Sequence, residues 1–321
     1  MKTVLAVFFA SFYGLGIRLL FGFMDNLVSI MSLTFLGLVP VVIGFVTVIL
    51  MPKNTSAVAA FFMPWFTSFV ILIITIALSI EGSICWLMIY PFFAIAASIG
   101  GLIAHWIHRR RLKNENPGRN NFGKPNALNM SLLLFVPALV GYVEGERTLR
   151  PVEYTVAREV SIPATPQEVW QQLTNTTVLH DEKRASFSSL IGFPHHLKTV
   201  TDTFAVGGRR LAVYEKGLYF KETISRYEIN RLLKLTIKTD PEKIPPTVMD
   251  EHILIGGKYL EILEDVYKLE PLPDGSCRVE LSGRFRINTP FNWYAGLWAH
   301  YLMADILQEE LDLLKLQATK Q

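Results

Sequence analysis

Long apolar runs fill the first 143 residues of the chain, and after Glu144 short stretches of alternating apolar and polar residues follow. A helix needs about 20 predominantly apolar residues to cross the hydrocarbon core of a membrane. The pattern predicts five spanning helices, at residues 3–24, 27–51, 57–80, 84–108 and 127–143. It therefore predicts a membrane part over 1–143, a linker over 144–152 and a separate domain over 153–321.

The charges in the connections between these runs predict how the chain is oriented. Lys2 precedes the first run and Lys53 follows the second. The connection between the fourth and fifth runs is basic, with Arg109, Arg110, Arg111, Lys113, Arg119 and Lys124. The remaining connections are acidic, with Asp25, Glu81, Glu144 and Glu146. Because basic loops are retained in the cytoplasm, five spans predict a cytoplasmic N-terminus and a domain on the outer, periplasmic face of a bacterial cytoplasmic (inner) membrane.

The fifth run decides this orientation. It is the shortest of the five and contains Pro137 and Gly141. If it is re-entrant instead of spanning, the domain lies in the cytoplasm, and Arg147 and Arg150 just beyond it favour that alternative.

Arg18 is a charged residue inside the first predicted span. It lies only about a turn and a half from the end of that span, so its guanidinium is expected to reach the outer interface. Apart from Arg18 and His105 the spans contain almost no ionisable residues, which disfavours an ion-coupled transporter. The first run is long and has no clear small-residue cleavage site, which disfavours a cleaved signal peptide.

Beyond the linker, apolar and polar residues alternate with a period of two, which predicts strands that each have one face on a core. The predicted strands are 154–162, 209–215, 219–229, 232–239, 258–270 and 277–288. Pro273-Asp274-Gly275 predicts a hairpin turn between the last two strands. Residues 249–255 are compatible with a short strand or a lid, and an irregular stretch is expected up to Lys198.

Two helices are predicted in this domain. Thr165 is followed three residues later by Glu168, which is the spacing of a capping box, and Pro166 suits the first helical position. A long terminal helix is predicted to be capped by Thr289 and to run to about Gln317.

This order of elements resembles the START-like superfamily (SRPBCC, Bet v 1-like), which includes polyketide cyclases, Bet v 1-type allergens and lipid-transfer domains. The resemblance covers about residues 153–317 and rests on EYTVAREVSIPATPQEVWQQLT (153–174), GLYFKETISRYEINRLLKLTIKT (217–239), the two paired strands and the terminal helix. It implies an α+β helix-grip fold, in which a curved antiparallel sheet wraps around the last helix and encloses an apolar cavity. The superfamily has no universal catalytic motif, so no catalytic residue follows from the resemblance.

The first half of the terminal helix is apolar on almost every side, so more than one side must be covered. Core packing, a ligand cavity, and contact with the spans or the bilayer are the three alternatives. The predicted ligand contacts are Trp170, Phe193, His195, His196, Tyr259, Tyr294, Trp298 and Tyr301.

Some titratable residues are candidates for acid–base chemistry, although they do not form a known motif. His195 and His196 are candidate general bases or residues at the mouth of a pocket. No pair of histidines has the i, i+4 spacing of a helical metal site and no HExxH motif occurs, so neither a metal nor another cofactor is predicted. Glu261 and Asp265 share one strand face by simple alternation; if this face is internal they are buried acids, but an external face is favoured because charges rarely bury unpaired.

Composition excludes several other classes. Net charge is +3, with much of the excess in the basic connection, which lacks the interleaved aromatics of a nucleic-acid-binding segment. The two cysteines, Cys85 and Cys277, lie in different parts of the chain and predict no disulfide. The leading interpretation is a membrane-tethered domain that binds a hydrophobic small molecule or lipid, with the bilayer as a second partner. The alternatives are a cyclase- or dehydratase-like enzyme, and an interaction or sensory module whose cavity is filled by side chains.

Overall fold

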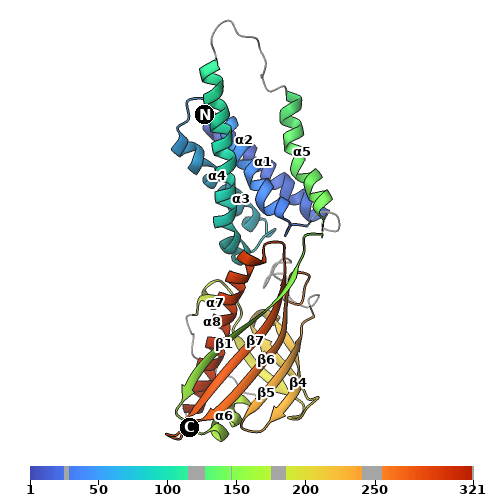
Figure 1. Ribbon diagram of the computed structural model, residues 1–321, viewed down its shortest axis with the longest axis vertical. Helices are drawn as coiled ribbons and strands as arrows, with labels where there is room; N and C mark the ends of the chain where they lie inside the picture. Colours follow the sequence, from blue (N-terminus) through green and yellow to red (C-terminus); the bar gives the residue numbers. More distant parts are fainter. Residues whose placement is uncertain (25–28, 115–126, 146, 175–185, 241–254, 320–321) are drawn as a thin grey trace. The chain divides into compact units, whose positions relative to one another are not determined.

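The computed structural model divides the chain into two compact units, Met1–Leu149 and Arg150–Gln321 (Figure 1). The residues that it describes are 1–24, 29–114, 127–145, 147–174, 186–240 and 255–319. Arg119, Lys124 and nearly all of the segment 249–255 lie outside these described residues.

The first unit is helical. Its elements are α1 (Lys2–Phe23), the π-helical turn η1 (Thr34–Leu38), α2 (Val39–Ile49), α3 (Ala57–Ala77), α4 (Ser83–Asn114) and α5 (Ala127–Glu144). Within the described residues, three helical segments are long and apolar enough to cross a membrane: Lys2–Phe23, Ala57–Ala77 and Cys85–Arg110. Two shorter apolar helical segments cover Thr34–Ile49 and Leu133–Glu144.

The second predicted span, 27–51, begins as a helix only at Thr34. The Ser32 hydroxyl oxygen accepts the Phe35 backbone N–H at 3.0 Å, as a capping side chain does. Glu144, the last residue of α5, adds a second cap, because its carboxylate accepts the backbone N–H groups of Leu33 and Thr34 at 2.8 Å each. The helix is therefore shorter than the apolar run that contains it.

Arg18 has a partner that the sequence interpretation lacked. Its Nε–H donates to Glu81 in the connection between α3 and α4, and the two side chains are only 11% and 7% exposed. Pairing offsets the cost of burying either charge alone.

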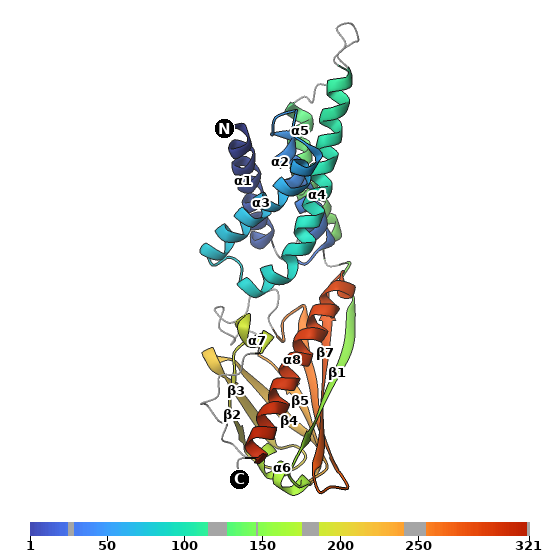
Figure 2. The same cartoon turned by 90° about the vertical axis from the view of Figure 1, so that its left-hand side faces the viewer.

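The second unit is one antiparallel sheet of seven strands in the order β1-β7-β6-β5-β4-β3-β2. The strands are β1 (Pro151–Ile162), β2 (His196–Thr201), β3 (Arg209–Tyr214), β4 (Tyr219–Glu228), β5 (Leu232–Lys238), β6 (Leu260–Pro271) and β7 (Cys277–Asn288). The helices are α6 (Pro166–Leu173), α7 (Phe187–Leu190) and α8 (Asn292–Thr319), with a 3₁₀ turn, η2 (Glu215–Gly217), between β3 and β4. Figure 2 shows α8 lying along the sheet, which curves around it. This is the helix-grip arrangement, and the predicted fold class is confirmed for this unit.

Local signals in the sequence explain most of these elements. The capping box of Thr165 and Glu168 is present at the start of α6. The alternation in 277–288 corresponds to β7, in which every second residue, starting from Cys277, is buried. On α8 the buried residues recur at helical spacing against the sheet, at Met303, Ala304, Leu307, Leu311, Leu314 and Ala318. These residues form one core with the inner face of the strands.

Two expectations need correction. The stretch expected to be irregular up to Lys198 contains the short helix α7 and the edge strand β2, which pairs with β3. The terminal helix starts at Asn292, not after Thr289, because the first i to i−4 bond runs from the Ala295 N–H to the Phe291 carbonyl. The Asn292 side-chain oxygen instead accepts the Thr289 N–H at 2.9 Å.

Candidate functional site

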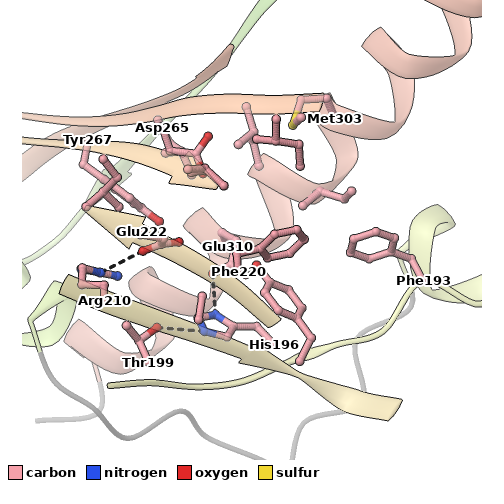
Figure 3. A pocket seen from close by; sticks show the side chains of 18 residues that line it. Phe193, His196, Thr199, Arg210, Phe220, Glu222, Asp265, Tyr267, Met303 and Glu310 are labelled. Atoms are coloured by element: carbon pink, nitrogen blue, oxygen red, sulfur yellow. Dashed lines mark hydrogen bonds and ion pairs between the residues drawn. The ribbon is translucent and has the colours of Figure 1, made fainter. Parts of the chain in front are cut away.

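A cavity of about 60 Å³ lies between α8 and the inner face of the sheet (Figure 3). At roughly 10–15 Å³ per water this volume holds only a few water molecules. Its apolar lining consists of Phe193, Ala212, Phe220, Leu235, Ile237, Ile262, Leu281, Met303, Ile306 and Leu307. Its polar lining consists of His196, Thr199, Arg210, Tyr214, Glu222, Asp265, Tyr267 and Glu310. The cavity is therefore not the purely apolar one that the resemblance implies, because ionisable groups gather in it.

Arg210 and Glu222 form a buried ion pair in this cavity. They lie directly opposite each other on β3 and β4, and Arg210 Nε–H donates to Glu222 Oε2 at 3.0 Å. The side chains are 6% and 8% exposed. Burial raises the pKa of Glu222, while the charges of Arg210 and His196 act against that rise.

His196 connects β2 to α8. Its Nδ1 lies 3.1 Å from Glu310 Oε2, its Nε2 lies 2.9 Å from Thr199 Oγ1, and its ring stacks on Tyr214. Burial alone would lower the pKa of His196, but the neighbouring carboxylates of Glu310 and Glu222 outweigh it, so the pKa is raised. Burial alone would raise the pKa of Glu310, but the contact with His196 holds this pKa below its ordinary value. The two groups therefore stabilise each other's charged form.

Asp265 is internal, whereas Glu261 is not. A bulge in β6 between Ile262 and Glu264 inserts one extra residue, so two positions that share a face by simple alternation point to opposite sides. Glu261 accepts a hydrogen bond from Arg286 on the outer face at 3.0 Å, while Asp265 lines the cavity. The favoured external assignment is thus correct for Glu261 and wrong for Asp265. Burial, followed by the charges of Glu222 and Glu310, raises the pKa of Asp265 to about 8.

The adjacent residues His195 and His196 also point to opposite sides, one outside the cavity and one into it. His196 faces the cavity, and His195 turns outward to place Nδ1 2.8 Å from Glu309 Oε1 on α8. Glu309 Oε2 also accepts the hydroxyl hydrogen of Ser186 at 2.7 Å. His195 therefore helps hold the segment around α7 against α8, outside the cavity.

The other predicted contacts do not converge on one site. Phe193 lines the cavity together with His196. Trp170 belongs to the core and packs against Tyr227, and Tyr259 is 6% exposed below the ammonium group of Lys258. Three predicted residues of α8 are outside the cavity lining: Tyr294, Trp298 and Tyr301. The last of these is 50% exposed and packs its ring edge-to-face on Phe187.

The charged residues of the cavity other than His196 were missed as ligand contacts by sequence interpretation. Glu222 could have been recognised from the sequence, since it shares one strand face with Phe220 and Ile224. A carboxylate in an apolar row indicates a buried acid. Among the described residues no group of three or more His, Cys, Asp or Glu side chains is arranged to hold a metal ion.

Comparison with known proteins shows to which family the chain belongs. Residues 153–319, more than half of the chain, match the family described as polyketide cyclase / dehydrase and lipid transport. The chain belongs to this family. None of the curated proteins compared with it matches.

Solved structures similar to this family member cover about half of it. A START superfamily protein from Mycobacterium smegmatis has 11% identity and a TM-score of 0.35, over 52% of this chain and 97% of its own. Truncated norcoclaurine synthase from Thalictrum flavum has 13% identity and a TM-score of 0.34, over 53% and 96%. Protein MLL2253 from Mesorhizobium loti has 16% identity and a TM-score of 0.32, over 52% and 98%.

Proposed function

We propose that this protein binds a hydrophobic small molecule or lipid in the cavity between α8 and the sheet, with the polar end of the ligand toward the charged residues. The observation that carries the proposal is the two-sided lining, in which ten apolar side chains adjoin a cluster of buried ionisable ones. Ligand sites in proteins typically combine such an apolar wall with a few placed polar groups. Membership of a family described by polyketide cyclases and lipid transport agrees with it.

The small volume of the cavity means that a ligand of ordinary size does not fit without movement of side chains. A cavity of about 60 Å³ is smaller than the roughly 150 Å³ cavity that accommodates benzene in an engineered protein. A larger ligand must therefore displace side chains of the lining, and Met303 and Ile306 of α8 and Phe193 are the ones we expect to move. Methionine suits this role because it is unbranched and adopts many rotamers.

Filling the cavity is expected to abolish binding. Ala212 on β3 lines the cavity, so Ala212→Phe should reduce co-purified ligand at least tenfold, as measured by native mass spectrometry and solvent extraction. Overpacking is expected to cost roughly 1–3 kcal/mol of stability. Leu211→Phe is the matched control, because Leu211 is the neighbouring residue on the outer face and is 37% exposed. Equal ligand content in both variants would contradict the proposal.

We further propose that the first unit anchors the domain in a bacterial cytoplasmic membrane with five spans, N-terminus inside and domain outside. Three helices of sufficient length and apolarity support the anchor, and the separation of basic from acidic connections supports the orientation.

A fusion of alkaline phosphatase to Gln321 tests that orientation. The phosphatase should be active, because it folds only outside the cytoplasm, and a β-galactosidase fusion at the same residue should be inactive. The reverse result would mean that 127–143 does not span and that the domain is cytoplasmic.

A second candidate function is a cyclase- or dehydratase-like enzyme. The observation that favours it is Asp265, a buried acid whose raised pKa of about 8 suits proton transfer near neutral pH. Mass spectrometry of metabolite extracts incubated with the protein would reveal turnover. Asp265→Asn and His196→Ala should abolish it, whereas His195→Ala, which changes a residue outside the cavity, should not.

A further inference from the structure

Two buried polar atoms of the cavity lining have no hydrogen-bond partner among the described residues, Arg210 Nη1 and Asp265 Oδ1. Arg210 is 7% exposed and uses its Nε–H on Glu222, which leaves a second edge of the guanidinium for another acceptor. Buried polar groups in proteins are nearly always paired. These two atoms therefore indicate where the polar end of a ligand is held.

The backbone around Asp265 also makes room for its carboxyl group. Gly283 on β7 lies directly opposite Asp265 on β6. A Cβ atom at Gly283 would lie 3.0 Å from Asp265 Oδ1 and 3.3 Å from Met303 Sδ. The absence of a side chain at position 283 thus lets the carboxyl group lie beneath α8.

The charges in the cavity restrict the class of ligand. Both basic side chains of the cavity already have a carboxylate partner, Arg210 with Glu222 at 3.0 Å and His196 with Glu310 at 3.1 Å, while burial raises the pKa of Asp265 to about 8 and so favours its neutral form at pH 7. A carboxylate ligand would add an uncompensated charge in a buried site. An ammonium group has no acceptor and would leave Arg210 Nη1 unpaired. A neutral oxygen accepts the hydrogen bond that Arg210 Nη1 lacks and adds no charge to the buried site.

We infer that the cavity binds the uncharged oxygen function of its ligand, a carbonyl or hydroxyl group, which accepts a hydrogen bond from Arg210 Nη1 and pairs with the carboxyl group of Asp265. This inference rests on the proposed function and names the chemistry of the ligand. The ketone or alcohol oxygen lies among the charged residues, and the hydrocarbon part lies along the apolar wall of Phe193, Phe220 and Ile306.

Binding of a ketone then depends on the protonation of Asp265. A ketone oxygen is only an acceptor, so it pairs with the carboxyl group when that group is protonated and can donate. Several groups of the cavity surround Asp265: Glu222 on β4, Glu310 on α8, Tyr267 on β6, Tyr214 and Arg210 on β3, and His196 on β2; the charge of the adjacent Glu264 acts on it from the other face of the sheet. At pH 9 only about a tenth of Asp265 is protonated, so the ketone affinity should fall about tenfold.

Probes that share one hydrocarbon skeleton test the inference on the full chain in lipid nanodiscs, with empty nanodiscs as the blank. Saturation-transfer NMR would measure the affinities of 2-hexanone, 1-hexanol, hexanoate, hexylammonium and hexane. At pH 7 the ketone or the alcohol should bind at least tenfold more tightly than the two ions and the alkane. Comparison of the ketone with the alcohol identifies which neutral oxygen is preferred.

Two variants separate binding from folding. Arg210→Met combined with Glu222→Met removes the ion pair without leaving a buried charge, and it should weaken ketone binding at least tenfold while hexane binding is kept. Asp265→Asn is neutral at every pH and has an N–H donor, so its ketone affinity should be the same at pH 7 and pH 9.

Four results would overturn the inference: equal or tighter binding of hexanoate or hexylammonium, unchanged ketone affinity in the double variant, a wild-type ketone affinity that is equal at pH 7 and pH 9, or no binding by any probe because water alone occupies the cavity. Failure of the proposed function is distinct. If a hydrophobic ligand co-purifies with the wild type and is lost in Ala212→Phe, that function stands even where the probes show no preference for a neutral oxygen.

Discussion

At pH 9, Asp265→Asn is expected to raise the free energy of unfolding of the Arg150–Gln321 unit by on the order of 5 kcal/mol. The unfolded chain releases the proton of this carboxyl group near pH 3.8, whereas the folded domain holds it to about pH 8. Between these values the folded state binds more protons, so stability falls as the pH rises through this window. Asparagine resembles the protonated acid in shape and does not ionise, so the variant avoids this loss.

The buried thiol of Cys277 supplies the measurement, since it is 0% exposed in the core of the same unit. In a Cys85→Ser background, the rate of thiol labelling reports how often the domain unfolds. Between pH 5 and pH 9, labelling corrected for thiolate content should accelerate steeply in the wild type and much less in Asp265→Asn. Asp274→Asn is the control, because hydrogen bonds from Ser276 lower the pKa of that exposed carboxyl group and it titrates below the window. Parallel slopes for the wild type and Asp265→Asn would show that Asp265 is ionised in the folded protein.

The second large effect is expected in the first unit, from Gly100→Ala. Helices α2 and α4 cross with their backbones in contact, and a Cβ atom at Gly100 would lie only 1.8 Å from the Val41 carbonyl oxygen. Backbone atoms cannot move aside as a flexible side chain can, so the two helices must separate. We expect a loss of about 3 kcal/mol or more and a melting temperature lower by roughly 10 °C.

Fluorescence-detected size-exclusion chromatography after heating in detergent measures this change. Gly16→Ala in α1 is the matched control, since nothing lies within 4 Å of its added Cβ atom. Alanine favours a helix over glycine by about 1 kcal/mol, so this control should be neutral or stabilised. Similar melting temperatures for Gly100→Ala and the wild type would mean that α2 and α4 do not pack in this way.

Regular periodicity explains which parts of the fold could be predicted. In β7 every second residue is apolar, and the strand was predicted with the bounds that the structure has. The edge strand β2 was missed because His196–Thr201 contains few apolar residues, and its place in the sheet depends on pairing with β3. Strand pairing of this kind is a tertiary property that a local pattern does not contain.

The site was harder to predict because it depends on breaks in periodicity. The bulge in β6 places Asp265 on the inner face and Glu261 on the outer face. No local sequence pattern predicts the extra residue of this bulge. The aromatic first half of α8 suggested ligand contacts at Tyr294, Trp298 and Tyr301, but the cavity is lined by the following turns of the helix, from Met303 to Glu310. Helix rotation and sheet curvature, which are set by packing, therefore determine which side chains meet.

Glu144 gives the link between the two units a mechanical property. Its carboxylate accepts hydrogen bonds from Thr34, the first residue of η1, and from the hydroxyl of Thr148 in the linker. One side chain therefore joins the end of α5, the beginning of η1 and the segment that leads into β1. We therefore expect a pulling force applied at Thr148 to be shared, through the Glu144 side chain, between the end of α5 and the start of η1.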